Sequence, residues 1–128
     1  DHFTLDAPFH FAAGKSGGTT ASELDEAWTS DNFPRLIAVR FQHPTPYFDD
    51  SYAVNSANDG PYGDALMTEL IPYVEERFRV IRQPYARVLW GGSTGGWESL
   101  ALQVYHPDLF GGAWIFFPDS VDFRRYDL

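Results

Sequence analysis

The chain contains no cysteine, which excludes disulfides, a thiolate nucleophile and cysteine-based metal sites. Basic residues are also scarce, because 9 Lys and Arg stand against 18 Asp and Glu and give a formal net charge of −9. Such a charge repels nucleic acid and anionic membranes, so we expect neither as a partner. No apolar run approaches the roughly 20 residues that span a bilayer, so we expect no membrane insertion.

Apolar and aromatic residues, in contrast, are plentiful. At 128 residues the chain has the length of about one domain, and its content of 44% hydrophobic and 17% aromatic residues is ample for a buried core. We therefore expect residues 1–128 to form a single domain.

The most informative segment is Ala86 to Glu98, which reads ARVLWGGSTGGWE. It contains a G-x-S-x-G pattern, preceded by a β-prone run and followed by apolar residues at helical spacing. In this strand-to-helix turn, glycine neighbours let a serine adopt a strained backbone and expose its hydroxyl. The pattern predicts Ser93 as a nucleophile and the backbone N–H of Thr94 as one oxyanion donor. We expect Gly92 beside it to contact substrate.

A glycine-rich turn can also bind phosphate, or simply connect a strand to a helix. A phosphate-binding loop needs either G-x-G-x-x-G or a lysine before its hydroxyl residue, and this turn has neither. A turn that holds an inert serine fits the residues and stays open as the alternative.

Hydrophobic patterning along the chain predicts an α/β fold with a parallel sheet of about three strands and crossover helices. The predicted strands are residues 36–39, 88–90 and 112–117, each a short apolar run. The predicted helices are residues 21–28, capped by Thr20 and Glu23; residues 64–79, capped by Asp64 and kinked or shortened at Pro72; and the segment from Ser93 to His106. Residues 42–63 form an unusually long predicted loop.

A serine nucleophile needs a histidine base and a carboxylate that orients the histidine. His106 lies about twelve residues along the helix from Ser93, roughly 18 Å away, and is interpreted as a helix C-cap. His43 follows the first predicted strand, at the sheet edge where ligands bind, and is a candidate substrate contact. His2 and His10 lie in the irregular N-terminal segment.

Asp119 comes just after the third predicted strand and is the candidate acid, with a turn or helix-capping role as the alternative. Trp97 is a candidate aromatic wall of the substrate site, with core packing as its alternative. Glu98 is interpreted as structural or as a secondary contact. The acidic and amide residues between 49 and 59 do not match a calcium-loop spacing. We expect no metal ion and no cofactor.

Two segments, TELIPYVEERFRV and GGSTGGWESLALQVYHPDLFGG, resemble the esterase D-like branch of the α/β-hydrolase superfamily over about Asp64 to Phe117. The helix after the elbow ends, as in that family, in tyrosine, proline, aspartate and phenylalanine, with His106 inserted. The commoner elbow has histidine before the serine and methionine after it, whereas this chain has Gly92 and Thr94. This difference weakens what the resemblance implies about the type of substrate more than what it implies about Ser93 as the nucleophile.

The resemblance implies a partial α/β-hydrolase fold and hydrolysis of a small-molecule ester, or acyl transfer, through a serine acyl-enzyme. In the family the histidine follows a strand well beyond the third strand predicted here. We therefore expect the chain to be a central portion of a larger hydrolase, with little or no turnover in isolation. A noncatalytic α/β binding module that retains the elbow is the competing hypothesis.

Overall fold

The structure of the chain is a computed structural model that describes residues 26–47 and 50–122. The chain divides into two units, residues 3–41 and residues 1–2 with 42–128, and each is considered by itself. The organisation of residues 1–128 as a single domain stays a prediction.

In the unit that ends at Phe41, residues 26–29 are helical and residues 34–41 have no regular secondary structure. The capping residues Thr20 and Glu23 lie outside the described residues. The prediction of a buried strand at 36–39 is wrong, because Leu36 and Ile37 are 55% and 47% exposed and residues 36–39 do not join a ladder. An apolar run signals a preference for burial, but a strand also needs a neighbour that pairs with its backbone.

The segment predicted as a long loop contains a small antiparallel pair, β1 (Asn55–Ser56) with β2 (Gly60–Pro61). Gly60 has a φ of +102°, a backbone conformation that suits glycine at this turn. The Asn55 side-chain oxygen accepts a hydrogen bond from the Asp64 backbone N–H at 3.0 Å. The pair thus satisfies a backbone donor in the first turn of the next helix.

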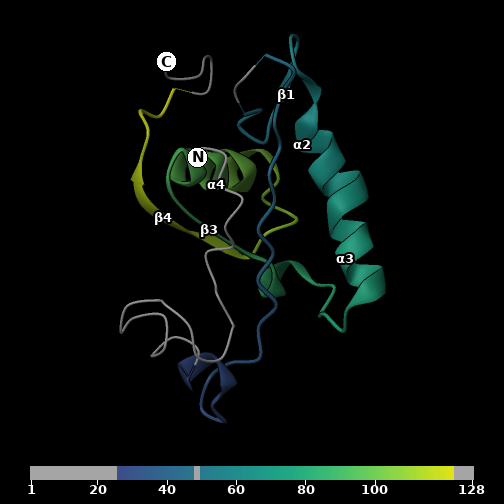
Figure 1. Cartoon of the computed structure of the whole chain (residues 1–128), viewed down its shortest axis with the longest axis vertical. Helices are drawn as coiled ribbons and strands as arrows, with labels where there is room; N and C mark the ends of the chain where they lie inside the picture. Colours follow the sequence, from purple (N-terminus) through teal and green to yellow (C-terminus); the bar gives the residue numbers. More distant parts are fainter. Residues whose placement is uncertain (1–25, 48–49, 123–128) are drawn as a thin grey trace. The chain divides into compact units, whose positions relative to one another are not determined.

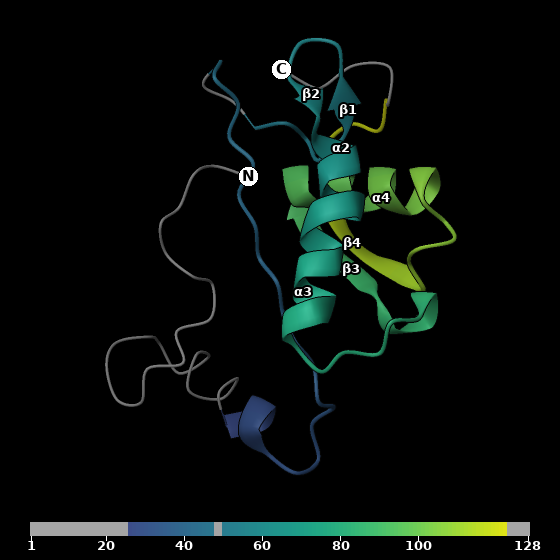
Figure 2. The ribbon, with the colours of Figure 1, turned by 90° about the vertical axis from the view of Figure 1, so that its right-hand side faces the viewer.

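That helix is a continuous segment made of α2 (Tyr62–Ala65), a π-helical turn (Leu66–Leu70) and α3 (Ile71–Arg77), which Figure 2 shows as one rod. It starts earlier than predicted, so Asp64 lies inside the first turn and is not the N-cap. Pro72 lacks a backbone N–H, and its ring would crowd the carbonyl of an ordinary α-helical turn. The π-helical turn lies directly before it, the kind of local adjustment expected near a proline.

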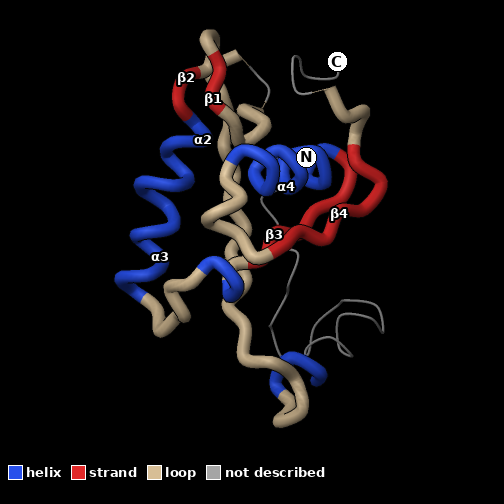
Figure 3. Tube along the Cα trace, turned by 180° about the vertical axis from the view of Figure 1, so that it is seen from behind, coloured by secondary structure: helices blue, strands red, loops and turns tan. Residues whose placement is uncertain are grey.

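The chain then forms a β-α-β unit of β3 (Val88–Ser93), α4 (Thr94–Tyr105) and β4 (Gly112–Pro118). β3 and β4 pair in parallel, with Trp90 opposite Trp114, and α4 connects them and lies along one side of the sheet (Figures 1 and 3). This β-α-β order confirms the prediction for the region from 88 onward. The parallel sheet among the described residues has two strands, however, and not the three that were predicted.

Packing against α4 forms the core of this unit. Trp97 is 1% exposed and Ala101 fully buried, and both contact Tyr52 from the preceding loop. The opposite face of the sheet carries exposed side chains, including Trp90 at 61% and Trp114 at 68%. One sheet face is therefore buried by α4 and the other is open within the described residues.

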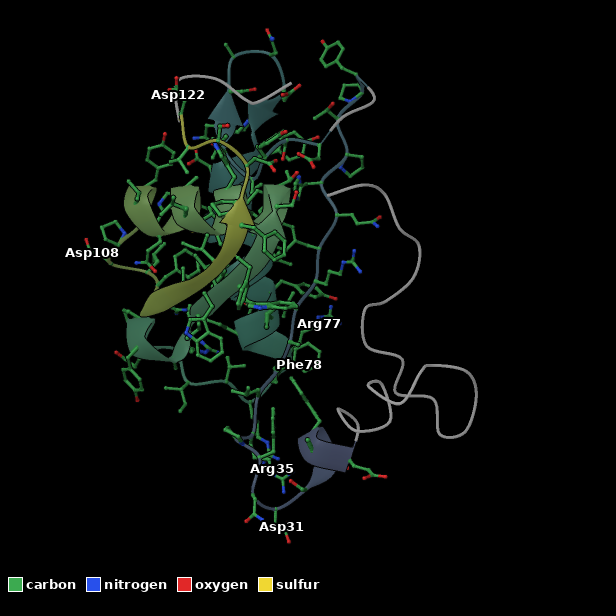
Figure 4. All side chains as sticks on the ribbon, turned by 90° about the vertical axis from the view of Figure 1, so that its left-hand side faces the viewer. Asp31, Arg35, Arg77, Phe78, Asp108 and Asp122 are labelled. Atoms are coloured by element: carbon green, nitrogen blue, oxygen red, sulfur yellow. The ribbon has the colours of Figure 1, made fainter. Side chains whose placement is uncertain are left out.

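An ion pair ties the helical rod to the start of β3. Arg87 donates from Nε to Glu75 Oε1 at 3.0 Å, and its Nη1 donates to the Leu109 carbonyl at 3.3 Å. The rod ends near Arg77 and Phe78, labelled in Figure 4, where the Arg77 guanidinium lies 4.5 Å over the Tyr73 ring. None of the helices in the described ranges is both long and apolar enough to cross a membrane.

Candidate active site

Ser93 lies at the junction between β3 and α4 with φ 56° and ψ −126°. A residue with a side chain rarely adopts this conformation, which costs on the order of 1–3 kcal/mol and persists only where the surrounding structure enforces it. Parallel pairing of β3 with β4 holds one side of Ser93, and the first turn of α4 holds the other. The strained serine predicted from the G-x-S-x-G pattern is present.

The glycines around Ser93 have unequal steric roles. A Cβ on Gly91 would lie 2.0 Å from the Gly95 carbonyl oxygen, a distance that the backbone cannot tolerate. A Cβ on Gly96 would lie 3.0 Å from the Phe116 carbonyl oxygen, whereas a Cβ on Gly95 would meet nothing within 4 Å. The turn therefore depends on Gly91 and Gly96. The pattern identifies the first of these but not the second.

Asp119 is the hydrogen-bond partner of the Ser93 hydroxyl. Ser93 Oγ donates to Asp119 Oδ1 at 3.1 Å, and Thr94 Oγ1 donates to Asp119 Oδ2 at 2.8 Å. The Asp119 backbone N–H also donates to the Ser93 carbonyl at 3.3 Å. A shift in register after Gly92 places Pro118 opposite Ser93 and so brings Asp119 beside the hydroxyl.

Thr94 is the first residue of α4, where backbone N–H groups have no acceptor within the helix. Its amide follows the strained serine directly, as the predicted role of an oxyanion donor requires. That role itself stays a prediction. The Thr94 side chain is used separately, in the hydrogen bond to Asp119.

Of the residues predicted to contact substrate, Gly92 lies in the elbow itself and Trp97 lies in the first turn of α4. Gly92 faces the exposed Phe117 side chain, since a Cβ there would lie 3.1 Å from a Phe117 ring carbon. Trp97 meets Tyr52 edge-on, with ring centroids 5.3 Å apart. Trp97 therefore packs the elbow helix against the loop, and a contact with substrate stays a prediction for both residues.

His43, the third candidate substrate contact, lies in a polar cluster with Ser51 and Glu98. Its Nδ1 is 2.9 Å from Ser51 Oγ, and its Nε2 is 3.4 Å from Glu98 Oε1. Burial lowers the pKa of His43, but the adjacent Glu98 carboxylate and the charge of Asp50 outweigh burial and raise it above the ordinary value of 6.5. Sequence reasoning did not bring these residues together, because the contact joins a loop to a helix more than forty residues later.

The other histidines do not provide a base at Ser93 within the described ranges. His106 is the C-cap of α4, as predicted, and its backbone N–H donates to the Leu102 carbonyl. His2 and His10 lie outside the described residues. Within the described residues, the Ser93 hydroxyl contacts the Asp119 carboxylate and not a histidine that could act as its general base.

The sequence of this chain matches a known protein family and a protein from Bacillus subtilis. Residues 16–119 match the family model described as "Putative esterase". The chain is also similar to the "Uncharacterized protein YbbA" of Bacillus subtilis (strain 168), with 26% identity over 98 residues. That alignment covers 69% of this chain and 39% of the relative, so the chain spans well under half the length of the curated relative it matches. Because the family model covers most of the chain and includes the whole β3-α4-β4 elbow, the chain belongs to the esterase family.

Proposed function

We propose that this chain carries the nucleophile elbow of a serine esterase acting on small carboxylic esters. The proposal rests mainly on the backbone of Ser93, whose φ of 56° at a strand-to-helix junction is the strained geometry expected of a nucleophile elbow. Membership of the esterase family supports the same chemistry.

In the proposed reaction, Ser93 Oγ forms a bond to the ester carbonyl carbon and gives up its proton to a base. The carbonyl oxygen becomes an oxyanion, and the Thr94 backbone N–H at the start of α4 donates a hydrogen bond to it. The alkoxide leaving group takes the proton, which leaves an acyl-enzyme that water then hydrolyses. We place the base on a histidine outside the described residues.

Asp119 has a positioning role in this proposal. Its carboxylate accepts hydrogen bonds from both hydroxyls of the elbow, which orients Ser93 Oγ before substrate arrives. A triad acid instead accepts a hydrogen bond from the histidine. Asp119 can take that part when its Oδ1 exchanges the Ser93 hydroxyl for an imidazole N–H.

Hydrolysis of p-nitrophenyl esters by the native protein tests the proposal. Ser93→Ala is expected to lower kcat/KM by at least about 10³-fold, because it removes the nucleophile. Ser120→Ala is the matched control, since Ser120 is an exposed serine outside the β3-α4 junction, and it is expected to leave the rate unchanged. If Ser93→Ala retained the wild-type rate, Ser93 would not be the nucleophile. Ester binding without hydrolysis by the folded protein would favour a noncatalytic binding module.

A further inference from the structure

His43, Asp50 and Glu98 form a cluster whose arrangement suits a metal ion. One ligand atom from each of the three side chains lies within 4.8 Å of the others. The His43 and Glu98 side chains are 11% and 13% exposed, so these two ligands are mostly buried, and Asp50 is half-buried. Two carboxylates and one imidazole at this spacing provide the mixed nitrogen and oxygen ligands of a transition-metal site.

The separation of His43 and Glu98 fits a bridging ion better than a direct hydrogen bond. His43 Nε2 and Glu98 Oε1 are 3.4 Å apart, longer than a well-formed N–H···O bond. Two ligand atoms that each lie about 2.1 Å from a tetrahedral Zn²⁺ are about 3.4 Å apart. Glu98 Oε1 is also buried and receives no hydrogen bond from the described residues. A metal ion would satisfy this oxygen.

Ser51 orients the imidazole as the neighbours of metal-bound histidines do. Its hydroxyl is 2.9 Å from His43 Nδ1, and the residue is fully buried. The Ser51 backbone N–H reaches both Nδ1 and the His43 carbonyl, each at 3.2 Å. When the Ser51 backbone N–H donates to the His43 carbonyl, His43 Nδ1 can carry a proton and donate a hydrogen bond to Ser51 Oγ. Nε2 is then unprotonated, and its lone pair is available on the side that faces Glu98.

The Asp50 carboxylate, the third ligand, accepts a hydrogen bond from the backbone of the turn that follows it. Its Oδ1 accepts the Tyr52 N–H at 2.9 Å, in a turn where Tyr52 and Ala53 both have positive φ. This hydrogen bond restrains the carboxylate before any ion binds, which reduces the entropy lost on binding.

We infer that His43, Asp50 and Glu98 bind one Zn²⁺ ion, with water in the fourth position. The imidazole ligand favours Zn²⁺ over Ca²⁺ or Mg²⁺, which prefer oxygen ligands. The ion fastens the loop that carries His43 to α4, the helix that begins at the serine elbow. The inference departs from the sequence expectation of no metal, and it does not depend on the proposed esterase activity.

Titration of the chelator-treated chain with ZnCl₂, in competition with a fluorescent chelator, tests the inference. We expect one saturable Zn²⁺ per chain, with His43→Gln and Glu98→Gln each weakening binding at least 10-fold. His106→Gln and Glu76→Gln are the matched controls, because they make the same changes at the end of α4 and on the exposed side of α3. Both controls are expected to bind Zn²⁺ as the wild type does.

Two further variants keep the test independent of folding. Asp50→Asn retains the oxygen that accepts the Tyr52 N–H, so it is expected to stay folded by circular dichroism while losing the Zn²⁺-dependent rise in Tm. Ser51→Ala keeps all three ligands but removes the orienting hydroxyl, and it is expected to weaken binding about 10- to 100-fold. Absence of saturable binding to the folded wild type, or equal weakening by the control variants, would overturn the inference.

Discussion

Replacement of Gly91 by alanine gives a sharp test of how the serine elbow is built. The added Cβ would lie 2.0 Å from the Gly95 carbonyl oxygen and 2.3 Å from its carbonyl carbon. Both are backbone atoms in the first turn of α4, so no side-chain rotation can relieve the clash. Either β3 or the start of α4 has to move.

Because the clashing atoms belong to the backbone, the Gly91→Ala substitution is expected to destabilise the folded protein. Adding one methyl group to a packed site costs typically 1–3 kcal/mol, and more where the backbone must shift, so we expect Gly91→Ala to lower the free energy of unfolding by at least about 3 kcal/mol. Gly95→Ala is the matched control. Its Cβ meets nothing within 4 Å, and alanine favours the helix over glycine, so it is expected to raise the free energy of unfolding by about 0.5 kcal/mol.

Urea unfolding of the two variants, followed by circular dichroism, measures the difference. With a denaturant slope of about 1–3 kcal/mol/M, a loss of 3 kcal/mol lowers the midpoint by at least about 1 M. The steric account of the elbow would be refuted if the two variants unfolded at the same urea concentration, or if Gly95→Ala were the less stable.

Three further predictions concern strain, the ion pair and pH. Ser93→Gly is expected to be more stable than Ser93→Ala by about 1–2 kcal/mol in thermal unfolding, because glycine accepts φ 56° without strain. Arg87→Gln is expected to cost about 2–3 kcal/mol in urea unfolding, because Glu75, 16% exposed, loses its charged partner; an unchanged midpoint would contradict this. Since the folded pKa of His43 is raised, the metal-free wild type is expected to be stabilised relative to His43→Gln below about pH 6.5, and to lose that advantage as pH rises through the folded pKa. Urea midpoints of both proteins across this pH range measure the effect, and a wild-type advantage that grew with pH would contradict the sign.

The elbow was predictable because its signals are local. A short apolar run, small residues at a tight turn and helical spacing after it all lie between residues 88 and 105, and the structure forms β3 and α4 there. The position of Asp119 was also accessible, since it follows β4 and neighbouring parallel strands end at the same edge. The C-cap at His106 followed from the proline after it.

The remaining features depend on contacts between distant segments. Leu36 and Ile37 have the composition of a strand, but composition does not supply a pairing partner. The hairpin of β1 and β2 has strands of two residues, too short to produce any periodicity. The meeting of His43 with Glu98 requires the turn at Asp50 to Ala53 to fold back onto α4, which no local pattern encodes.

The central claim is that the strained serine at the elbow is the nucleophile of an esterase, and covalent labelling tests it most directly. Treatment of the folded native protein with a fluorophosphonate, followed by peptide mass spectrometry, is expected to place a single adduct on Ser93. The adduct is expected to be absent from Ser93→Ala and retained in Ser120→Ala. A folded protein with no adduct, or with its adduct on another serine, would contradict the claim.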